Sequence, residues 1–314
     1  MAPIMTSALP PPGYWGRMTV YLAEMYPVPS RLLLALLLYV SLAGLLREVH
    51  GVFTSHSLLP TLIGTWSFFA VGLAVRLMDE LKDRVLDRHL FPDRPLPSGR
   101  VLESDITLSL AAVIVLYLAA NFWMGTAIWM ALAVLGYALL MYRHFFMRRI
   151  LDKSPALTLA THQPLFPLLL FYAVALVAVE HGWSVRTLDW SAIILAVFMY
   201  WAMFFAVEIA RKIRAPGEET PYLTYSKMWG PRAAVLVAAG AQTVSLGIGL
   251  HFHYALSLSP AFPGILLAAY VIVWWGYLRF LGNPAPATSK LKPYAEAYLL
   301  LVLLAQALEQ GGLA

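Results

Sequence analysis

The chain has 314 residues, of which 60% are hydrophobic and only 12% are charged. Soluble domains carry about 25% charged residues, so this composition predicts an integral membrane protein without a large soluble domain, in line with a mean hydropathy of +0.70. Cysteine is absent, which excludes disulfides, thiolate catalysis and zinc–thiolate sites. The basic residues behind the net charge of +5 form no recognised nucleic-acid-binding motif, and we expect no nucleic-acid partner.

Nine apolar segments each approach the ~20 residues that cross a bilayer as a helix. They predict an all-α fold in which nine transmembrane helices surround a central cavity, and residues 1–314 make a single transmembrane domain. The Pro-rich N-terminal segment 1–30 has no signal-peptide pattern, and its residues 14–26 favour a short surface helix. The predicted spans are 32–48, 59–78, 106–123, 125–142, 156–179, 191–207, 233–253, 262–282 and 294–308.

The distribution of Lys and Arg predicts the orientation of these spans. If the N-terminus is cytoplasmic, 20 of the 22 basic residues fall on the cytoplasmic side, and only Arg47 and Arg186 fall outside. This pattern supports an odd number of spans with the C-terminus outside. It also places two long loops, after the second and sixth spans, in the cytoplasm. In a bacterial source the membrane would be the cell (inner) membrane.

Residues 79–87 concentrate four carboxylates at the end of the second span. Asp79, Asp83 and Asp87 are four residues apart, and Glu80 lies three before Asp83, so on a helix they share much of one face. Like charges this close repel unless a cation lies among them. Mg²⁺ takes oxygen ligands and is often held by one or two carboxylates plus substrate phosphates. The segment therefore predicts a metal–phosphate site at a membrane surface.

The loop after the sixth span repeats the first loop in outline. When the two are superposed, Asp79 falls on Glu208 and Asp83 on Lys212, which indicates a diverged duplication, a weak internal repeat of four-helix halves. Basic groups replace expected acids in the second loop, and such groups bind phosphate oxygens. We therefore expect the first loop to hold most of the metal. The second loop is expected to contact a diphosphate through Arg211, Lys212 and Arg214.

Three polar residues inside the apolar segments allow more than one interpretation. Arg76, one turn before Glu80, either neutralises the carboxylates, contacts a diphosphate or extends to the membrane surface. His162 and Gln163 directly precede Pro164. They could position an acceptor or lose a proton, but we favour the interpretation that they satisfy backbone groups freed by the proline.

The first loop resembles that of the UbiA-type intramembrane prenyltransferases. That family has nine helices, cytoplasmic loops after helices 2 and 6, and the motif Asn-Asp-x-x-Asp-x-x-x-Asp in the first loop. Asp79, Glu80, Asp83 and Asp87 stand at its four positions, with departures at the first two. The following residues 94–99, Arg-Pro-Leu-Pro-Ser-Gly, match the family's Arg-Pro-hydrophobic-Pro-Ser-Gly.

The resemblance implies an all-helical prenyltransferase that uses Mg²⁺, with Asp79, Glu80, Asp83 and Asp87 as metal ligands. The second motif is divergent, because only Glu208 clearly remains of its acids. The residues expected to be catalytic are Asp83, Glu208 and Lys212. The residues expected to bind the substrate diphosphate are Arg76, Lys82, Arg94, Arg211, Lys212 and Arg214.

The activity implied is transfer of an isoprenoid from a prenyl diphosphate to an aromatic or lipid-pathway acceptor, with release of pyrophosphate. Mg²⁺ would stabilise the departing pyrophosphate, and the allylic cation would form in an apolar cavity where aromatic faces stabilise it. The aromatic candidates are Trp66, Phe68, Phe69, Tyr200, Trp201, Phe204 and Phe205.

Two other functions remain open. An intramembrane terpene cyclase on the same scaffold would ionise a prenyl diphosphate without an external acceptor, and the altered second loop favours such a specialisation. A transporter or channel with an acidic cation site is less well supported, because the acids lie at one membrane face and transporter sites typically lie near the midplane. Both enzymatic alternatives imply the same two partners, a prenyl diphosphate substrate and the lipid bilayer.

Overall fold

The structure is a computed structural model that describes residues 13–53, 57–151, 153–219 and 224–309. Within these ranges it contains α-helices and one short 3₁₀ turn, η1 (His144–Phe146), and no strand. The helices are α1 (Tyr14–Met25), α2 (Val28–Val49), α3 (Leu58–Lys82), α4 (Arg84–Leu90), α5 (Glu103–Phe122), α6 (Ala127–Tyr142), α7 (Arg148–Leu151), α8 (Pro155–His162), α9 (Leu165–Glu180), α10 (Trp190–Ala210), α11 (Tyr225–Trp229), α12 (Pro231–Leu256), α13 (Ala261–Gly282) and α14 (Lys292–Glu309).

All nine predicted apolar segments are helical, and the prediction of an all-α multi-pass membrane protein is confirmed. Seven segments are long and apolar enough to cross a bilayer, with lengths of 20 to 26 residues. The other two are shorter or more polar: α6 has 16 residues, and α14 carries Lys292, Glu296 and Glu309. The count of nine spans, the internal repeat and the orientation in the membrane stay predictions.

Two helices differ from the sequence-based expectation. In the fifth span the helical hydrogen bonding is interrupted, because the chain makes a turn at Gln163 and Pro164 between α8 and α9. Proline lacks the N–H that would continue the helical ladder. The acidic segment is likewise not one straight helix. Asp83 (φ −98°, ψ 7°) separates α3 from α4, so Asp79 and Asp87 belong to different helices.

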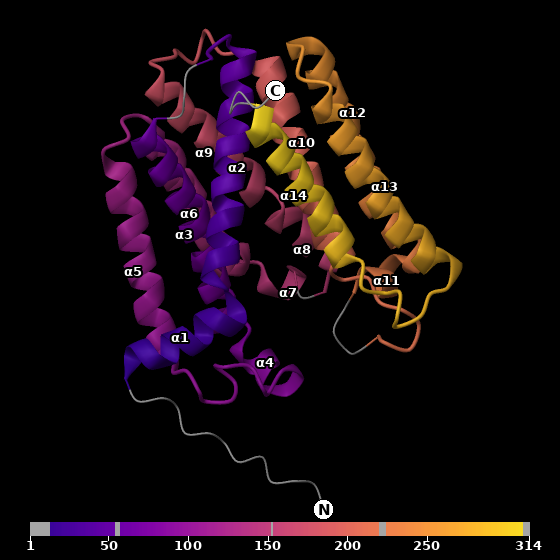
Figure 1. Cartoon of the computed structure of the whole chain (residues 1–314). Coiled ribbons are helices and arrows are strands. Elements are labelled where there is room, and N and C mark those ends of the chain that lie inside the picture. Colours follow the sequence, from indigo (N-terminus) through magenta and orange to yellow (C-terminus); the bar gives the residue numbers. More distant parts are fainter. Residues whose placement is uncertain (1–12, 54–56, 152, 220–223, 310–314) are drawn as a thin grey trace, which may run out of the picture.

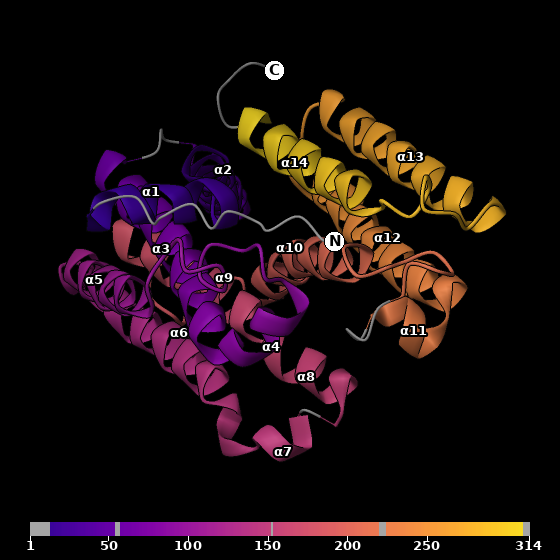
Figure 2. The ribbon, with the colours of Figure 1, turned by 90° about the horizontal axis from the view of Figure 1, so that it is seen from below.

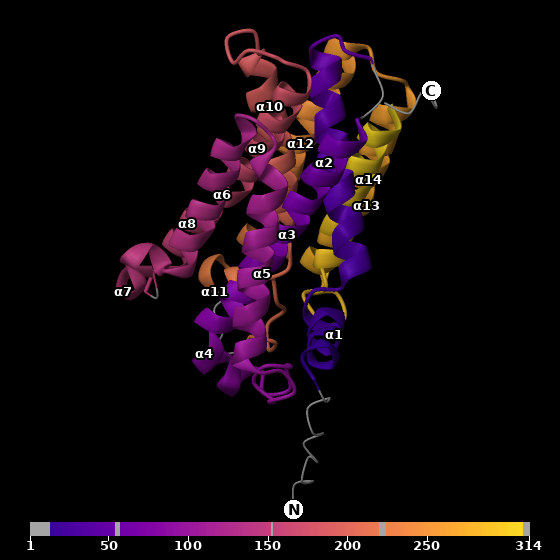
Figure 3. The same ribbon diagram turned by 90° about the vertical axis from the view of Figure 1, so that its left-hand side faces the viewer.

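The helices form two groups that meet along the middle of the bundle. Helices α2, α3, α5 and α6 lie on one side and α12, α13 and α14 on the other, with α9 and α10 near the centre (Figures 1 and 2). Helix α10 packs against α12, α3 against α5, α6 against α9, and α14 against α2. The short helices α1, α4, α7 and α11 all lie at one end of the bundle (Figures 1 and 3), which we call the loop end.

Helix α1 is the surface helix expected at 14–26, and it lies across the loop end (Figure 1). The Arg17 guanidinium donates two hydrogen bonds to the Asp105 carboxylate at the start of α5, at 2.6 and 2.8 Å. The Arg100 guanidinium forms an ion pair with Glu24 near the other end of α1. Hydrogen bonding from Arg100 holds the pKa of Glu24 below its ordinary value. Two ion pairs therefore fix α1 across the loop end.

Candidate functional site

A cavity of about 470 Å³ lies between α2, α3, α8, α9 and α10. Its charged lining residues come from the start of α2 and the ends of α3 and α10, which all lie at the loop end, while its deeper walls are apolar. Such an apolar pocket with a few convergent polar groups is the typical architecture of a small-molecule site. Its polar lining residues are Arg31, Arg76, Asp79, His162, Gln163, Glu208 and Arg211.

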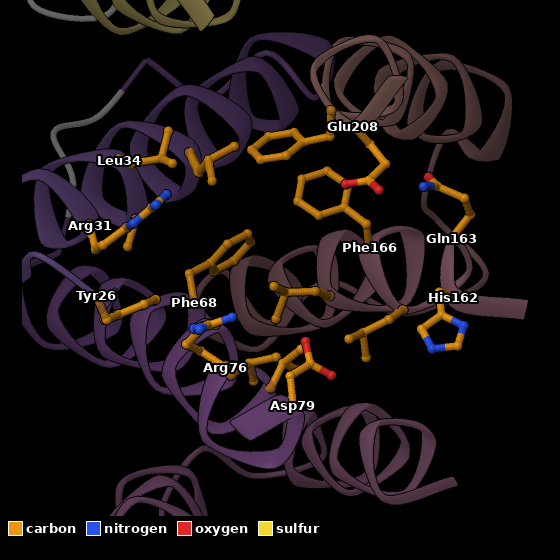
Figure 4. A pocket seen from close by; sticks show the side chains of 18 of the residues that line it. Tyr26, Arg31, Leu34, Phe68, Arg76, Asp79, His162, Gln163, Phe166 and Glu208 are labelled. Carbon is orange, nitrogen blue, oxygen red and sulfur yellow. The ribbon is translucent and has the colours of Figure 1, made fainter. Parts of the chain in front are cut away.

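Carboxylates from the two predicted loops face each other across this cavity. Asp79 from α3 and Glu208 from α10 point into the same opening from opposite sides (Figure 4). Each carboxylate already has a cationic partner: Lys82 Nζ lies 2.9 Å from Asp79, and Lys212 Nζ lies 3.0 Å from Glu208. Arg211 Nε lies 2.5 Å from Glu208 as well. The opening therefore combines acidic and basic groups within one rim.

Two arginines supply positive charge on one flank of the opening. Arg31 at the start of α2 and Arg76 on α3 both line the cavity (Figure 4), and the Nε atom of each is buried without a hydrogen-bond partner in the described part of the chain. Arg76 forms an ion pair with Glu80, whose side chain is only 1% exposed. Buried donors without partners are costly. An anion in the opening would satisfy them.

The apolar wall of the cavity is partly aromatic. The rings of Phe166 on α9 and Phe204 on α10 pack with centroids 3.9 Å apart, and Phe68 on α3 lines the same space (Figure 4). Tyr26, directly after α1, also lines it, and its hydroxyl donates to the Phe69 carbonyl at 3.0 Å. Aromatic faces can stabilise a positive charge that develops in such a chamber.

The remaining acids of the first loop lie beside the cavity rather than in its lining. Asp83 is partly buried where α3 meets α4, and burial raises its pKa against the opposing effect of Lys82. Asp87 on α4 is buried and accepts a hydrogen bond from Arg94 at 2.9 Å. The Arg94 guanidinium also lies over the Phe91 ring, 3.7 Å from its centroid. Arg94 therefore ties the Pro-rich segment to α4.

The second loop is held close to α10 by hydrogen bonds with α11. The Ser226 hydroxyl donates to Glu219 at 2.6 Å, and the Arg214 backbone N–H donates to the Ser226 hydroxyl at 2.9 Å. The Arg214 side chain donates to the backbone carbonyls of Arg211 and Ile213. In this position the Arg214 guanidinium is occupied with its own loop rather than with the cavity.

The helix break at Gln163 brings two further polar groups to the cavity. The Gln163 side-chain oxygen accepts a hydrogen bond from the Trp201 indole at 2.9 Å, and His162 Nδ1 lies 2.7 Å from the Thr158 carbonyl. A carbonyl oxygen only accepts, so in the neutral imidazole Nδ1 carries the hydrogen and Nε2 keeps a lone pair. Neither of these hydrogen bonds goes to the Ala160 carbonyl, which loses its helical partner at Pro164, and both side chains line the cavity.

The cavity unites some of the residues singled out in the sequence and omits others. The predicted site residues that line it are Arg76, Asp79, Glu208 and Arg211, joined by the aromatic candidates Phe68 and Phe204. Those outside its lining are Glu80, Lys82, Asp83, Asp87, Arg94, Lys212 and Arg214, with the aromatic candidates Trp66, Phe69, Tyr200, Trp201 and Phe205. The lining residues that the sequence did not single out include Tyr26, Arg31 and Phe166. No sequence motif marks these three, because only the packing of α1, α2 and α9 brings them to the cavity.

The carboxylate oxygens in the opening fit a magnesium ion whose remaining ligands come from water and a substrate. Among the described residues no group of three or more Asp, Glu or His side chains is arranged to hold a metal. Asp79 and Glu208 nevertheless offer carboxylate oxygens to the same opening. Mg²⁺ is commonly held by one or two carboxylates, with water and substrate phosphates completing its coordination.

Comparisons with known proteins agree with this architecture. The chain is similar to a structure reported for digeranylgeranylglyceryl phosphate synthase in membranes, with a TM-score of 0.61 and 15% identity over 94% of this chain and 98% of that chain. It is also similar to a UbiA homologue from Aeropyrum pernix K1, with a TM-score of 0.60 and 16% identity over 88% of this chain and 96% of that chain. A comparison with curated proteins gave no match. The model of the UbiA prenyltransferase family matches residues 37–300, and the chain therefore belongs to this family.

Proposed function

We propose that this protein is a Mg²⁺-dependent prenyltransferase that moves an isoprenoid from a prenyl diphosphate to an aromatic or lipid-pathway acceptor and releases pyrophosphate. The observation that carries the proposal is the single opening in which Asp79, Glu208 and Arg76 meet above an apolar chamber. A polar rim suits a diphosphate, and the chamber behind it suits a hydrocarbon chain.

The basic and acidic residues of the rim would bind the diphosphate in different ways. Arg31, Arg76 and Arg211 provide guanidinium donors, which form strong charge-assisted hydrogen bonds with phosphate oxygens. Asp79 and Glu208 would hold the magnesium ion, which when bound neutralises diphosphate charge and stabilises the leaving group. Use of Mg²⁺ for diphosphate binding is general in the family to which the chain belongs. Asp83 lies beside the cavity, near the proposed magnesium ligand Asp79, and adds a further negative charge there.

The transfer breaks the bond between the allylic carbon and the diphosphate oxygen, and the electron pair leaves with pyrophosphate. The acceptor then supplies an electron pair for the new bond and gives up a proton. Phe68, Phe166 and Phe204 surround the position where positive charge develops and exclude water from it. Water exclusion favours transfer over hydrolysis of the diphosphate.

His162 is suited to accept the proton that the acceptor loses. Its Nδ1 is held by the Thr158 carbonyl, which leaves Nε2 as the proton acceptor on a ring that lines the cavity. Substitution of His162 with Gln should slow formation of the prenylated product, with little change in the affinity for prenyl diphosphate. Equal loss of product formation and of diphosphate binding would instead assign His162 to substrate binding.

The proposed activity is tested with purified protein, Mg²⁺ and prenyl diphosphates of increasing length, with and without an extract of membrane lipids and quinone precursors. Pyrophosphate and the lipid product are measured together. The transferase proposal expects little turnover until the extract is added, and the mass of the product then gives the acceptor. Absence of pyrophosphate release with every diphosphate, with and without the extract, would contradict it.

A terpene cyclase is the second candidate, and the aromatic wall of Phe68, Phe166 and Phe204 favours it. Such a wall can guide a cation that is quenched internally or by water. A cyclic hydrocarbon or alcohol formed with pyrophosphate in the absence of the extract would favour the cyclase. An absolute requirement for an acceptor would exclude it.

A further inference from the structure

A second cavity, of about 660 Å³, lies at the loop end near the last turn of α3. It is formed by the end of α3, the start of α4, the start of α5, the end of α6 and the segment from η1 to α7. Figure 3 shows that α4 and α7 both lie at this end of the bundle. Its lining and that of the central cavity have no residue in common.

The lining of this second cavity is strongly basic. Lys82, Arg84, Arg143, His144 and Arg148 line it, whereas Glu103 is the only acid in the lining. Arg84 forms an ion pair with Glu103 across the rim. Lys82 also pairs with Asp79, so two of these cations have acidic partners at the rim. Arg143 and Arg148 add further positive charge from the segment between α6 and α7, and this charge complements a phosphate group.

Apolar side chains beside these cations are exposed. Phe146 is 75% exposed and Val85 is 65% exposed, and both line the cavity. Ile150 on α7, close to Arg148 in the chain, is 55% exposed. Exposed apolar residues next to basic ones are typical of a protein surface that lies at the boundary between lipid headgroups and acyl chains. A soluble phosphate would give these apolar groups no partner.

The backbone between α6 and α7 has the conformation that produces this arrangement. Residues 144–146 all have left-handed backbone angles, with φ of 51°, 50° and 57°. Three consecutive non-glycine residues in this region are uncommon, and such strain is concentrated at functional sites. Because of this sharp turn, four of the six residues 143–148 line the same cavity: Arg143, His144, Phe146 and Arg148.

We propose that this cavity, which we call the basic cavity, binds the headgroup of an anionic phospholipid of the surrounding bilayer. The cations would hold the phosphate, and Val85 and Phe146 would contact the first acyl carbons. Basic pockets between transmembrane helices are known to bind anionic lipid headgroups. Lys82 lines the basic cavity and also pairs with Asp79. The Lys82 side chain would therefore connect the bound lipid with the proposed diphosphate site.

The inference is tested with the full-length protein in nanodiscs that contain equal amounts of phosphatidylglycerol and phosphatidylcholine. Native mass spectrometry identifies the lipids that remain bound to the protein after it is released from the nanodiscs. We expect phosphatidylglycerol to be enriched, and Arg143→Gln combined with Arg148→Gln should lower the enrichment on the order of tenfold. Arg149→Gln is the matched control, because Arg149 is an exposed arginine of α7 outside the cavity lining.

A photoactivatable phosphatidylglycerol locates the lipid independently of the variants. Labelling within residues 142–148 is expected, and labelling confined to other segments would overturn the proposal. Equal retention of the two lipids by the unaltered protein would also overturn it. Displacement of phosphatidylglycerol by millimolar inorganic phosphate would assign the cavity to a free anion rather than a lipid. Thermal unfolding confirms that the double variant is folded before its lipids are compared.

Discussion

Arg76 reaches the central cavity from α3 with its guanidinium paired to the buried carboxylate of Glu80, one helical turn further along. The pair explains how an arginine remains charged at the edge of an apolar chamber. It also gives Glu80 a partner within α3, on a side chain that is 1% exposed and outside the cavity lining. The relationship distinguishes a supporting carboxylate from one that faces the substrate.

Replacement of Glu80 with Gln should therefore reduce stability more than it changes the magnesium requirement. Loss of one partner of a fully buried pair costs about 3–5 kcal/mol, and Arg76 is partly exposed, so we expect about 1–3 kcal/mol here. Thermal unfolding and the Mg²⁺ concentration for half-maximal activity are measured together. Glu103→Gln, in an exposed ion pair with Arg84, is the control. A large rise in the magnesium requirement would assign Glu80 to the metal.

Substitution of Arg31 with Gln should weaken binding of the prenyl diphosphate, because the guanidinium is a proposed phosphate donor with a buried Nε atom. Hydrogen bonds to charged groups contribute about 1.5–3 kcal/mol, so KM should rise roughly 10-fold or more. Steady-state kinetics with varied diphosphate give KM and kcat separately. Arg88→Gln is the matched control, because Arg88 is exposed on α4 and outside the cavity lining. Similar kinetics for the two variants would remove Arg31 from the site.

Removal of the Phe166 ring should let the cavity accept longer isoprenoid chains. Phe166 packs on Phe204 at 3.9 Å and closes part of the apolar wall, so Phe166→Ala extends the chamber. Competition between prenyl diphosphates of different lengths should shift toward the longer one by at least one isoprene unit. Phe205→Ala, at a position outside the lining, should leave the preference unchanged. Equal shifts in both variants would point to a general loosening of the bundle.

Docking of α1 should depend on pH through Glu24. The Arg100 guanidinium lowers the pKa of Glu24 in the folded protein relative to about 4.3 for an unpaired Glu. The ion pair therefore adds stability above pH 4.3, and that contribution is lost as the pH falls through the lowered pKa. Hydrogen exchange of residues 14–25 is compared between the unaltered protein and Glu24→Gln. The difference in protection seen at pH 7 should disappear in stronger acid, and its persistence there would contradict this account.

The sequence predicts the helical segments and part of the site because hydropathy and charge are local properties of the chain. Asp79 and Glu208 follow long apolar runs, so their position at one end of the bundle could be read directly. The convergence of Arg31 and Phe166 could not, because it depends on how α2 and α9 pack against α3 and α10.

The different roles of the neighbouring acids Asp79 and Glu80 also could not be predicted from the sequence. Spacing places Glu80 beside Asp79, but only the packing of α3 shows that Glu80 is buried in the bundle and pairs with Arg76. Pro164 indicated the interruption of the helix at Gln163, yet the hydrogen bond from Trp201 to Gln163 depends on the position of α10. Tertiary packing therefore decides which of several adjacent polar residues reach the substrate.

The measurement that tests the account most directly compares Asp79→Asn and Glu208→Gln with the unaltered protein. Magnesium-dependent release of pyrophosphate is measured with the preferred prenyl diphosphate and the acceptor extract, and Asp93→Asn, exposed in the first loop and outside the cavity lining, is the control. We predict that each site variant loses about 100-fold or more in kcat/KM, whereas the control keeps its activity. Full activity in both site variants would contradict the assignment of this cavity as the active site.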